Sequence, residues 1–495
     1  MGILVIDVGT SSMKGFYFNN EAQVLSQARR SYRPVYHSSE CVTQNPLILK
    51  NALFQISREI QEWCKNNQQK IHAVSLTAQR SSVIPADQDG NPLSDALMWQ
   101  DKRNLHICEE LKEKNKEIIR LSGTSINHVF SGSKMTWIRR EKEELYKKTY
   151  KFLVVADYLL YQITGMFKTD RTYASRSHLM NLRTGQWDEE LLKIFQIEKE
   201  KLCDLMDPGK CHGTVCKEFG CQTGITEGTP VYSAGGDQQC AALGMGVLNE
   251  GNLEITSGTG AFIIGMTKQL PEKFLGNPII NYSAVKGYYI VEASILTCCA
   301  AFDWFCTNFY KGGSGIDYKE INREIMQSPP GANGCMLLPF FQGRATPLWN
   351  PKATASFTNV TLSTTRGDMA RAVLEGIAYE IKNNIDVVEG QIGEVYRILI
   401  GGGLSKSEAF NQIQTDVYGK RLIYYSNMEA TALGAWISTA VQSGIYASIY
   451  ENFQKAREKD QIIYYYPVME HVLEYKKYRK QMNQIYRKLY ETERR

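Results

Sequence analysis

The fold is decided near the N-terminus by Leu4-Val5-Ile6-Asp7-Val8-Gly9-Thr10-Ser11-Ser12, an apolar strand that runs into a turn of glycine and hydroxyl residues. A second apolar run over residues 13–18 follows the turn and predicts a hairpin. Residues 252–265 repeat the plan around the turn Thr256-Ser257-Gly258-Thr259-Gly260. Two such hairpins predict two lobes of related design, each presenting a turn of backbone N–H groups to the same ligand.

Helical and strand-like stretches alternate along the rest of the chain. The apolar periodicities predict helices over residues 47–67, 104–120, 369–388 and 407–418, and strands over 73–77, 151–155 and 396–400. This alternation is typical of an α/β fold. At 495 residues the chain is too long for one compact core. We therefore expect an N-terminal lobe over residues 1–245 and a C-terminal lobe over 246–495, with a ligand in a cleft between them.

The composition indicates an ordinary globular protein. Apolar residues make up 43% of the chain and charged residues 22%, and the net charge is only +5. No run is long enough to span a bilayer and no export signal follows Met1, so we expect a cytoplasmic protein with no membrane or nucleic-acid partner. In a reducing compartment the twelve cysteines should be free thiols. The four-residue gaps among the cysteines from Cys203 to Cys221 do not suit a zinc site.

The C-terminal end is amphipathic and basic. Its apolar residues recur at spacings of three and four, with lysines and arginines between them: Tyr475, Tyr478, Met482, Ile485 and Leu489. One interpretation is a helix that lies on a membrane or a partner. We favour the other, a terminal helix docked on its own lobe with a solvated basic face.

The two turns have the groups of a phosphate site. The first turn and its strands offer a carboxylate, three hydroxyls and a cation: Asp7, Thr10, Ser11, Ser12 and Lys14. Such a set suits a polyphosphate with a magnesium ion, because carboxylate and phosphate oxygens are the ligands that this cation prefers. In the second turn, Gly258 and Gly260 would let the backbone approach a phosphate closely beside Thr259.

Two more glycine-rich segments are candidates for chemistry. Gly401-Gly402-Gly403 ends a predicted strand and opens toward a helix, where a nucleoside or its phosphates can bind, although a structural turn explains three glycines almost as well. Asp237 follows Gly235-Gly236, and a glycine turn beside a cleft can aim an acidic side chain at a substrate; a solvated surface turn is the alternative. The P-loop and Rossmann fingerprints are absent, which excludes an ordinary P-loop ATPase.

Taken together, these and further segments resemble the FGGY carbohydrate kinases, a branch of the actin and hexokinase superfamily, over nearly the whole chain. The matching segments are Asp7 to Lys14, Gln79-Arg80 with Trp99-Gln100-Asp101, Phe130 to Lys134 with Trp137, Tyr173 to Arg176, Gly236 to Gln239, Ser257 to Gly260, Thr365-Arg366 through Glu375 to Ala378, Gly401 to Gly403, and Glu429 to Ala435.

The resemblance implies two actin-like (ribonuclease H-like) lobes and transfer of the γ-phosphoryl group of ATP to a hydroxyl of a small sugar or polyol. It implies that the phosphates lie between the hairpins, adenosine on the second lobe and the sugar on the first. In this family the position of Asp237 is the general base and that of Asp7 helps to hold Mg²⁺. The other nucleotide candidates come from the turns: Thr10, Ser11, Ser12, Lys14, Thr259, Gly260, Gly402 and Gly403.

The acceptor site resembles that of glycerol kinases but departs from it at two positions. Those kinases carry Glu directly after the arginine and Tyr before the Phe-Ser-Gly stretch, whereas this chain has Ser81 and Val129. Both lost groups hydrogen-bond glycerol, so glycerol is disfavoured, and the smaller side chains would leave room for a longer polyol or for a ketose such as xylulose.

Four more residues complete the expected acceptor site. Arg80 would donate bidentate hydrogen bonds to hydroxyls, Trp99 would supply an apolar surface, and Gln238 would be a further donor, beside Asp101. The alternative is that Arg80 pairs with Asp101 and that Trp99 fills core.

Other functions stay open at this point. They are a glycerol kinase, an actin-like nucleotide-dependent regulatory protein without sugar kinase activity, and an inactive kinase-like scaffold. The acceptor, its phosphorylated carbon and the oligomeric state, for which a homodimer is one alternative, do not follow from the residues.

Overall fold

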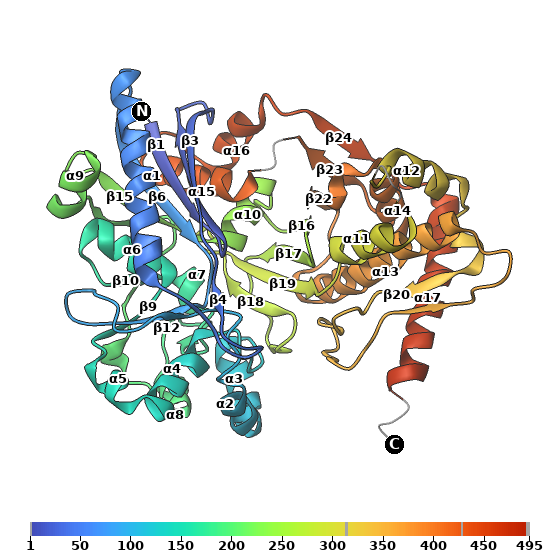
Figure 1. Cartoon of the computed structure of the whole chain (residues 1–495), viewed down its shortest axis with the longest axis horizontal. Coiled ribbons are helices and arrows are strands. Elements are labelled where there is room, and N and C mark those ends of the chain that lie inside the picture. The colour runs from blue at the N-terminus through green and yellow to red at the C-terminus, as the bar shows by residue number, and fades with distance from the viewer. Residues whose placement is uncertain (1, 312–314, 427–428, 492–495) are drawn as a thin grey trace. The chain divides into compact units, whose positions relative to one another are not determined.

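The computed structural model describes residues 2–311, 315–426 and 429–491. They form two compact α/β units (Figure 1). The first unit consists of Met1–Leu248, Lys268–Ile290 and Glu429–Lys459, and the second of Asn249–Thr267, Val291–Met428 and Asp460–Arg495. Two segments from beyond residue 245 therefore belong with the N-terminal part of the chain. The cleft expected between the lobes stays a prediction.

The first unit is built on a six-stranded mixed sheet with the strand order β14-β15-β6-β1-β2-β3. Its strands are β1 (Gly2–Val8), β2 (Ser12–Phe18), β3 (Val24–Ser31), β6 (Ile71–Ala78), β14 (Cys211–Thr214) and β15 (Pro230–Gly236). β1 pairs antiparallel with β2 and parallel with β6, which in turn pairs parallel with β15. The predicted first hairpin and the strand over 73–77 are confirmed.

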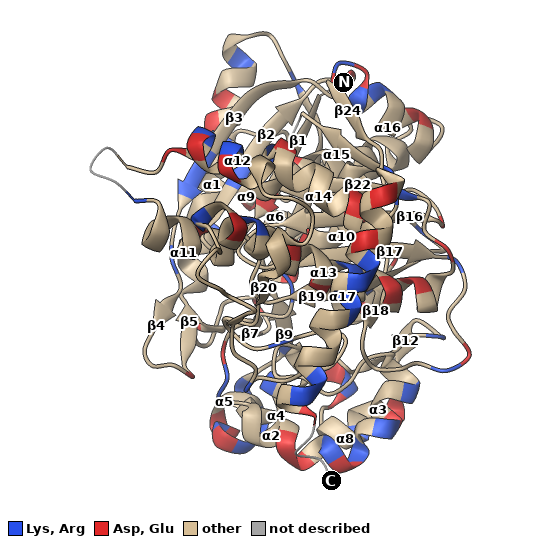
Figure 2. Ribbon diagram, turned by 90° about the vertical axis from the view of Figure 1, so that its right-hand side faces the viewer, with Lys and Arg blue, Asp and Glu red and all other residues tan. Residues whose placement is uncertain are grey.

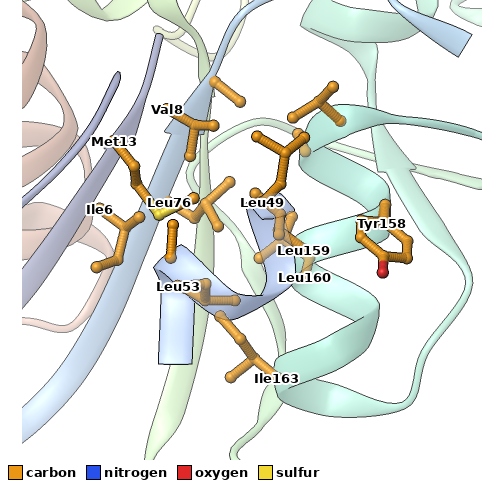
Figure 3. Packing of buried hydrophobic residues seen from close by; sticks show 14 of the residues in the cluster. Ile6, Val8, Met13, Leu49, Leu53, Leu76, Tyr158, Leu159, Leu160 and Ile163 are labelled. Atoms are coloured by element: carbon orange, nitrogen blue, oxygen red, sulfur yellow. The ribbon is translucent and has the colours of Figure 1, made fainter. Parts of the chain in front are cut away.

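Helices α1 (Pro46–Asn66) and α6 (Val155–Thr164) enclose the main core of this unit with the sheet. The α1 helix begins where Asn45 accepts the Leu47 N–H at 2.9 Å and Pro46 takes the first turn, where its missing N–H is not needed. The buried side chains of this core include Ile6, Val8, Met13, Leu49, Leu53, Leu76, Tyr158, Leu159, Leu160 and Ile163 (Figure 3).

A smaller five-stranded sheet with the order β4-β5-β8-β7-β9 completes the first unit together with short helices. Its strands are β4 (Val35–Tyr36), β5 (Val42–Gln44), β7 (Val83–Ala86), β8 (Ala96–Leu97) and β9 (Lys151–Val154). The remaining strands are β10 (Lys168–Asp170), β11 (Met180–Asn181), β12 (Gln186–Trp187), β13 (Asp204–Met206) and β18 (Ile279–Tyr282). The short helices are α2 (Leu105–Glu110), α3 (Asn115–Ser122), α4 (Ser131–Glu141), α5 (Glu143–Lys148), α7 (Arg171–Ala174), α8 (Glu189–Phe195), α9 (Lys217–Thr223) and α16 (Ile449–Arg457).

The single helix predicted over residues 104–120 is wrong, because the chain forms α2 and α3 with a 3₁₀ turn, Leu111–Lys114, between them. The side chain of Asn115, the first residue of α3, accepts the Ile126 N–H at 2.8 Å and so ties the start of α3 to the segment that follows the helix. Since Ile107, Leu111 and Ile118 are all buried, the apolar spacing gave no sign of this break.

Two helices of the first unit cross at glycines. In α10 (Asp237–Met245), a Cβ atom on Gly244 would overlap the Ala430 carbonyl oxygen. In α15 (Ala430–Gln442), a Cβ atom on Gly434 would overlap the Cys240 carbonyl oxygen. Only glycine permits this reciprocal backbone contact. The contact explains why a helix from residue 430 onward packs in the first unit.

The sheet of the second unit repeats this plan, with the order β19-β17-β16-β22-β23-β24. Its strands are β16 (Asn252–Ser257), β17 (Ala261–Thr267), β19 (Tyr289–Ile295), β22 (Arg397–Gly402), β23 (Leu422–Tyr425) and β24 (Ile462–Tyr465). β16 pairs antiparallel with β17 and parallel with β22, which pairs parallel with β23. This is the pairing of β1, β2, β6 and β15, so the predicted internal repeat is confirmed.

The helices of the second unit match the sequence predictions closely. The stretches predicted as helices over 369–388 and 407–418 are α13 (Arg366–Ile392) and α14 (Glu408–Tyr418). The unit also contains α11 (Cys299–Phe309), α12 (Tyr318–Gln327), α17 (Met469–Tyr490) and the strands β20 (Met336–Leu338) and β21 (Ser356–Thr358). No helix in the described ranges is both long and apolar enough to cross a bilayer.

The C-terminal helix α17 docks on α13 within the second unit, as the favoured interpretation expects. Arg371 of α13 donates to the Tyr475 hydroxyl at 2.7 Å, and that hydroxyl donates to Glu375 at 3.0 Å. Figure 2 shows the basic residues that α17 carries. One detail of the prediction is wrong: Leu489 is exposed and Tyr486 is buried in its place. The buried face follows Tyr475, Met482 and Tyr486, and the guanidinium of Arg344, which lies 4.2 Å from the centre of the Tyr486 ring, favours that register.

We expect Tyr475→Phe to lower the free energy of unfolding by about 1–3 kcal/mol, because it leaves buried Arg371 and Glu375 with one partner fewer. Urea unfolding followed by circular dichroism measures the change. The matched control is Tyr478→Phe on the same helix, a half-buried position where we expect a change within about 0.5 kcal/mol. Equal effects of the two substitutions would contradict the assigned role of the Tyr475 hydroxyl.

Candidate functional site

The first turn places its predicted residues beside one another at the end of the β1–β2 hairpin. Asp7 lies directly across from Lys14 in the strand register. The turn is closed by the Gly9 N–H, which donates to the Ser12 carbonyl at 2.9 Å. Its side chains are accessible: Thr10 is half-buried and Ser11 is exposed. The exposed position of Ser11 leaves its side chain accessible to a ligand.

Asp7 lies in a strained electrostatic setting. Burial raises the pKa of its carboxyl to about 7, and the charges of Asp237 and Glu429 add to the rise while Lys14 opposes it. Lys14 itself forms an ion pair with Glu429 at 2.9 Å. Sequence reasoning assigned no role to Glu429, although the residue stood in a quoted segment. The sequence signal was an acidic residue directly before the segment that forms α15.

Asp237 is the first residue of α10 and directly follows Gly235 and Gly236, the last two residues of β15. Gly235 has a φ of 111°, a conformation that favours glycine. Its carbonyl accepts hydrogen bonds from Thr77 and Tyr173, both at 2.8 Å. The Gly236 N–H donates to Thr172 at 2.9 Å. These bonds from β6 and α7 fix the backbone that carries the carboxylate, and the sequence analysis had assigned no role to the residues that make them.

The carboxylate of Asp237 forms an ion pair with Arg80, with 3.3 Å between Nε and Oδ1. Arg80 also donates to Gln239 at 3.3 Å. The Arg80 side chain is 7% exposed and that of Asp237 is 26% exposed, so the acid reaches solvent while its partner does not. The alternative pairing of Arg80 with Asp101 is not what the structure shows.

Trp99 is tied to the first turn rather than to the core. Its indole N–H donates to the Thr10 hydroxyl at 3.1 Å, and the Thr10 hydroxyl lies 3.4 Å from the Gln79 side-chain oxygen. The backbone N–H of Trp99 donates to Ser82 at 3.0 Å. These bonds bring a predicted acceptor-site residue into contact with a predicted nucleotide-site residue.

The remaining acceptor-site candidates have different surroundings. Asp101 is fully buried, and its carboxylate accepts from the Arg103 guanidinium at 2.8 Å and from the Val42 N–H at 2.9 Å. Val129 is half-buried, and its carbonyl accepts from Lys134. Ser81 has a positive φ of 71° and a buried hydroxyl without a hydrogen-bond partner among the described residues. The buried side-chain oxygen of Gln238 also lacks one there.

In the second unit, the predicted turn and the glycine segment are joined by their backbones. The Gly403 N–H donates to the Ser257 carbonyl at 2.7 Å. Gly402 has a φ of 89°, and a Cβ atom there would overlap the Ser257 carbonyl oxygen. Within the turn, the Gly258 N–H donates to the Gly260 carbonyl at 2.8 Å, and the Thr259 side chain is exposed. The structure therefore brings Thr259, Gly260, Gly402 and Gly403 together.

A buried carboxylate lies on the strand that leads into this turn. Glu254 of β16 is fully buried and accepts from the Thr256 hydroxyl at 3.0 Å. Burial raises the pKa of Glu254 to about 8, and the charge of Glu292 adds to the rise. The acid is therefore largely protonated at neutral pH in the folded chain.

In the described parts of the chain, no three His, Cys, Asp or Glu side chains gather closely enough to hold an ion by themselves. A cavity of about 450 Å³ opens in the second unit at the start of α13, and its lining includes Thr365, Arg366 and Asp368 but no predicted site residue. A magnesium ion that keeps waters and phosphate oxygens needs only one or two carboxylates, which is the arrangement that Asp7 offers.

Comparison with known proteins gives a consistent result. The family model described as "FGGY family of carbohydrate kinases, N-terminal domain" matches residues 2–244, and that for the C-terminal domain matches residues 253–443. A glycerol kinase from Thermococcus onnurineus is 28% identical over 92% of this chain and 91% of its own length. A xylulose kinase from Bacillus subtilis is 25% identical over 96% and 94%. The crystal structure of Plasmodium falciparum glycerol kinase with ADP superposes with a TM-score of 0.89 at 26% identity, covering 99% of this chain and 97% of that one.

The raised pKa of Glu254 predicts how stability depends on pH. Because the folded chain holds this proton up to about pH 8 and the unfolded chain loses it near pH 4.5, the stability contributed by the protonated acid falls as pH rises between these values. Glu254→Gln should remove that fall and stabilise the protein at pH 8.5 by about 4–5 kcal/mol, measured by urea unfolding from pH 5 to 8.5. Glu394→Gln, an exposed position in the same unit, should leave the pH dependence unchanged. Parallel pH profiles for wild type and Glu254→Gln would contradict the prediction.

Proposed function

The chain belongs to the FGGY family of carbohydrate kinases, phosphotransferases with an alcohol acceptor, and we propose that it transfers the γ-phosphoryl group of ATP to a hydroxyl of a ketose or of a polyol longer than glycerol. The single observation that carries the proposal is the geometry of Asp237, a partly exposed carboxylate at a helix start, fixed by its glycine backbone and paired with a buried arginine.

Asp237 is the proposed general base. The buried Arg80 favours its ionised form, and an ionised carboxylate can accept a proton. As the acceptor oxygen bonds to the γ-phosphorus, its proton passes to Asp237, and the bond from phosphorus to the bridging oxygen of ADP breaks. Such a base contributes roughly 10²–10⁴ in rate, and charge stabilisation around the transferring group must supply much of the rest.

Asp7 is the proposed carboxylate for Mg²⁺, with Thr10, Ser11, Ser12 and Lys14 as contacts for the phosphates. The chemistry of Asp7 fits a cation, since its pKa is raised by burial and by neighbouring carboxylates that a divalent ion would counterbalance. Bound Mg²⁺ would neutralise negative charge on the phosphate oxygens. In the second unit, the joined turns of Thr259-Gly260 and Gly402-Gly403 are the proposed nucleotide contacts.

The identity of the acceptor rests on two buried polar atoms. The Ser81 hydroxyl and the Gln238 side-chain oxygen have no partners in the described chain, and an unpaired buried polar group is costly unless a ligand pairs with it. An acceptor with several hydroxyls could supply both partners. Ser81 and Val129 also stand where glycerol kinases carry a glutamate and a tyrosine, so a longer acceptor fits better than glycerol. The xylulose kinase among the relatives supports a ketose.

We expect a C4 to C6 ketose or polyol to exceed glycerol in kcat/KM by at least about tenfold, because the chain lacks two groups that bond glycerol. A coupled ADP-release assay across C3 to C6 polyols, ketoses and sugar acids measures the difference. Glycerol as the best acceptor would overturn the acceptor assignment and leave the base assignment standing.

We expect Asp237→Asn to lower kcat for the best acceptor in that panel by about 10²-fold or more, while ADP binding measured by calorimetry persists. The amide keeps the size of the side chain but cannot accept the proton. Asp204→Asn, at an exposed position in the same unit, is the matched control and should keep normal turnover. Normal turnover in Asp237→Asn would reject the base.

A further inference from the structure

Two adjacent cysteines lie at the glycine turns of the second unit. Cys298 directly precedes α11, and Cys299 is the first residue of that helix. Cys298 is fully buried, whereas Cys299 is half-buried. Neither residue has a role in the proposed transfer reaction.

Cys299 joins three segments of the chain. The backbone N–H groups of Cys298 and Cys299 donate to the carbonyls of Thr259 and Gly258 at 2.7 and 2.9 Å. The Cys299 thiol donates to the Ser257 carbonyl at 3.1 Å, the same oxygen that the Gly403 N–H contacts at 2.7 Å. The sulfur thus lies where the turn after β16 meets the turn after β22.

The space around this sulfur is limited on the side of the glycine turn. A Cβ atom on Gly403 would lie 3.3 Å from the Cys299 sulfur, which is tighter than an ordinary contact. A group attached to the sulfur would therefore occupy one of two places. It can displace the turn at Gly402-Gly403, or it can lie on the solvent-exposed side of the half-buried Cys299.

The two thiols are chemically unequal. A hydrogen bond from the Cys298 thiol lowers the pKa of Cys299, and the backbone N–H of Leu404 adds to this, while burial and the charge of Asp303 oppose it. Donating that bond and being buried raise the pKa of Cys298 well above its usual range. Cys299 is accordingly the more acidic of the two thiols, and it is also the more accessible one.

We propose that Cys299 is a site of reversible thiol modification that excludes nucleotide from the second unit. The inference rests on the proposed function, because it takes the turns at Thr259 and Gly402-Gly403 as nucleotide contacts. With a small disulfide such as glutathione disulfide, Cys299 gives up its proton to solvent and its sulfur attacks one sulfur of the reagent. A new S–S bond forms, the old S–S bond breaks, and the departing thiolate takes up a proton. Excess thiol reverses the exchange.

The experiment combines protection and inactivation on the full chain. Iodoacetamide labelling of Cys299, followed by peptide mass spectrometry, should slow about 100-fold at an ADP concentration about 100 times its dissociation constant. Labelling of Cys221, exposed on the first unit, should not change and serves as the internal control. Treatment with glutathione disulfide should raise the dissociation constant for ADP at least about tenfold, and dithiothreitol should restore it.

Two variants separate the sites. In Cys299→Ser, the ratio of ADP affinities before and after treatment should be one, whatever the starting affinity of the variant. Cys221→Ser should respond like wild type. If ADP binding survives full modification of Cys299, the inference is overturned and the proposed function stands. If untreated wild type and Cys299→Ser both fail to bind ADP, the nucleotide assignment itself is overturned, and the exclusion with it.

Discussion

The contact between α10 and α15 at Gly244 and Gly434 is the constraint on which the arrangement of the first unit depends. Two helix backbones can approach this closely only where neither carries a side chain. The α10 helix begins at Asp237, and Glu429 directly precedes α15. By fixing the two helices against each other, the crossing fixes the residues at both of their N-terminal ends. The buried Arg457 donates to the Gly244 carbonyl and secures the same junction.

The site that this crossing organises is unbalanced in charge. Three carboxylates, Asp7, Asp237 and Glu429, are set against the two cations Arg80 and Lys14. The repulsion adds to the effect of burial, and together they raise the pKa of the Asp7 carboxyl to about 7. Such repulsion fits the proposed role of Asp7, because a bound cation would offset the surplus of negative charge.

The hairpins, the α/β class and the internal repeat could be predicted because each rests on local signals, namely apolar strands and turns of small residues. The pairing of Arg80 with Asp237 could not, since the two residues are far apart in the sequence and periodicity carries no information about such partners. The break between α2 and α3 was hidden for a different reason, as its apolar spacing suits one helix equally well. Ser81 shows a third limit: a positive φ at serine has no sequence signature. The family resemblance identified the candidate site residues, whereas their contacts are visible only in the structure.

The position of α15 in the first unit has a consequence for how the chain folds during synthesis. The sheet of this unit is complete once β15 has been made, yet the stripe of α10 at Cys240 and Gly244 stays uncovered until residues 430–457 leave the ribosome. More than a third of the protein is therefore translated while an apolar helix face has no partner. Such an intermediate is exposed to aggregation and is the kind of species that chaperones hold. A nascent chain arrested before residue 430 would carry the whole sheet of the first unit and still lack its closing helix.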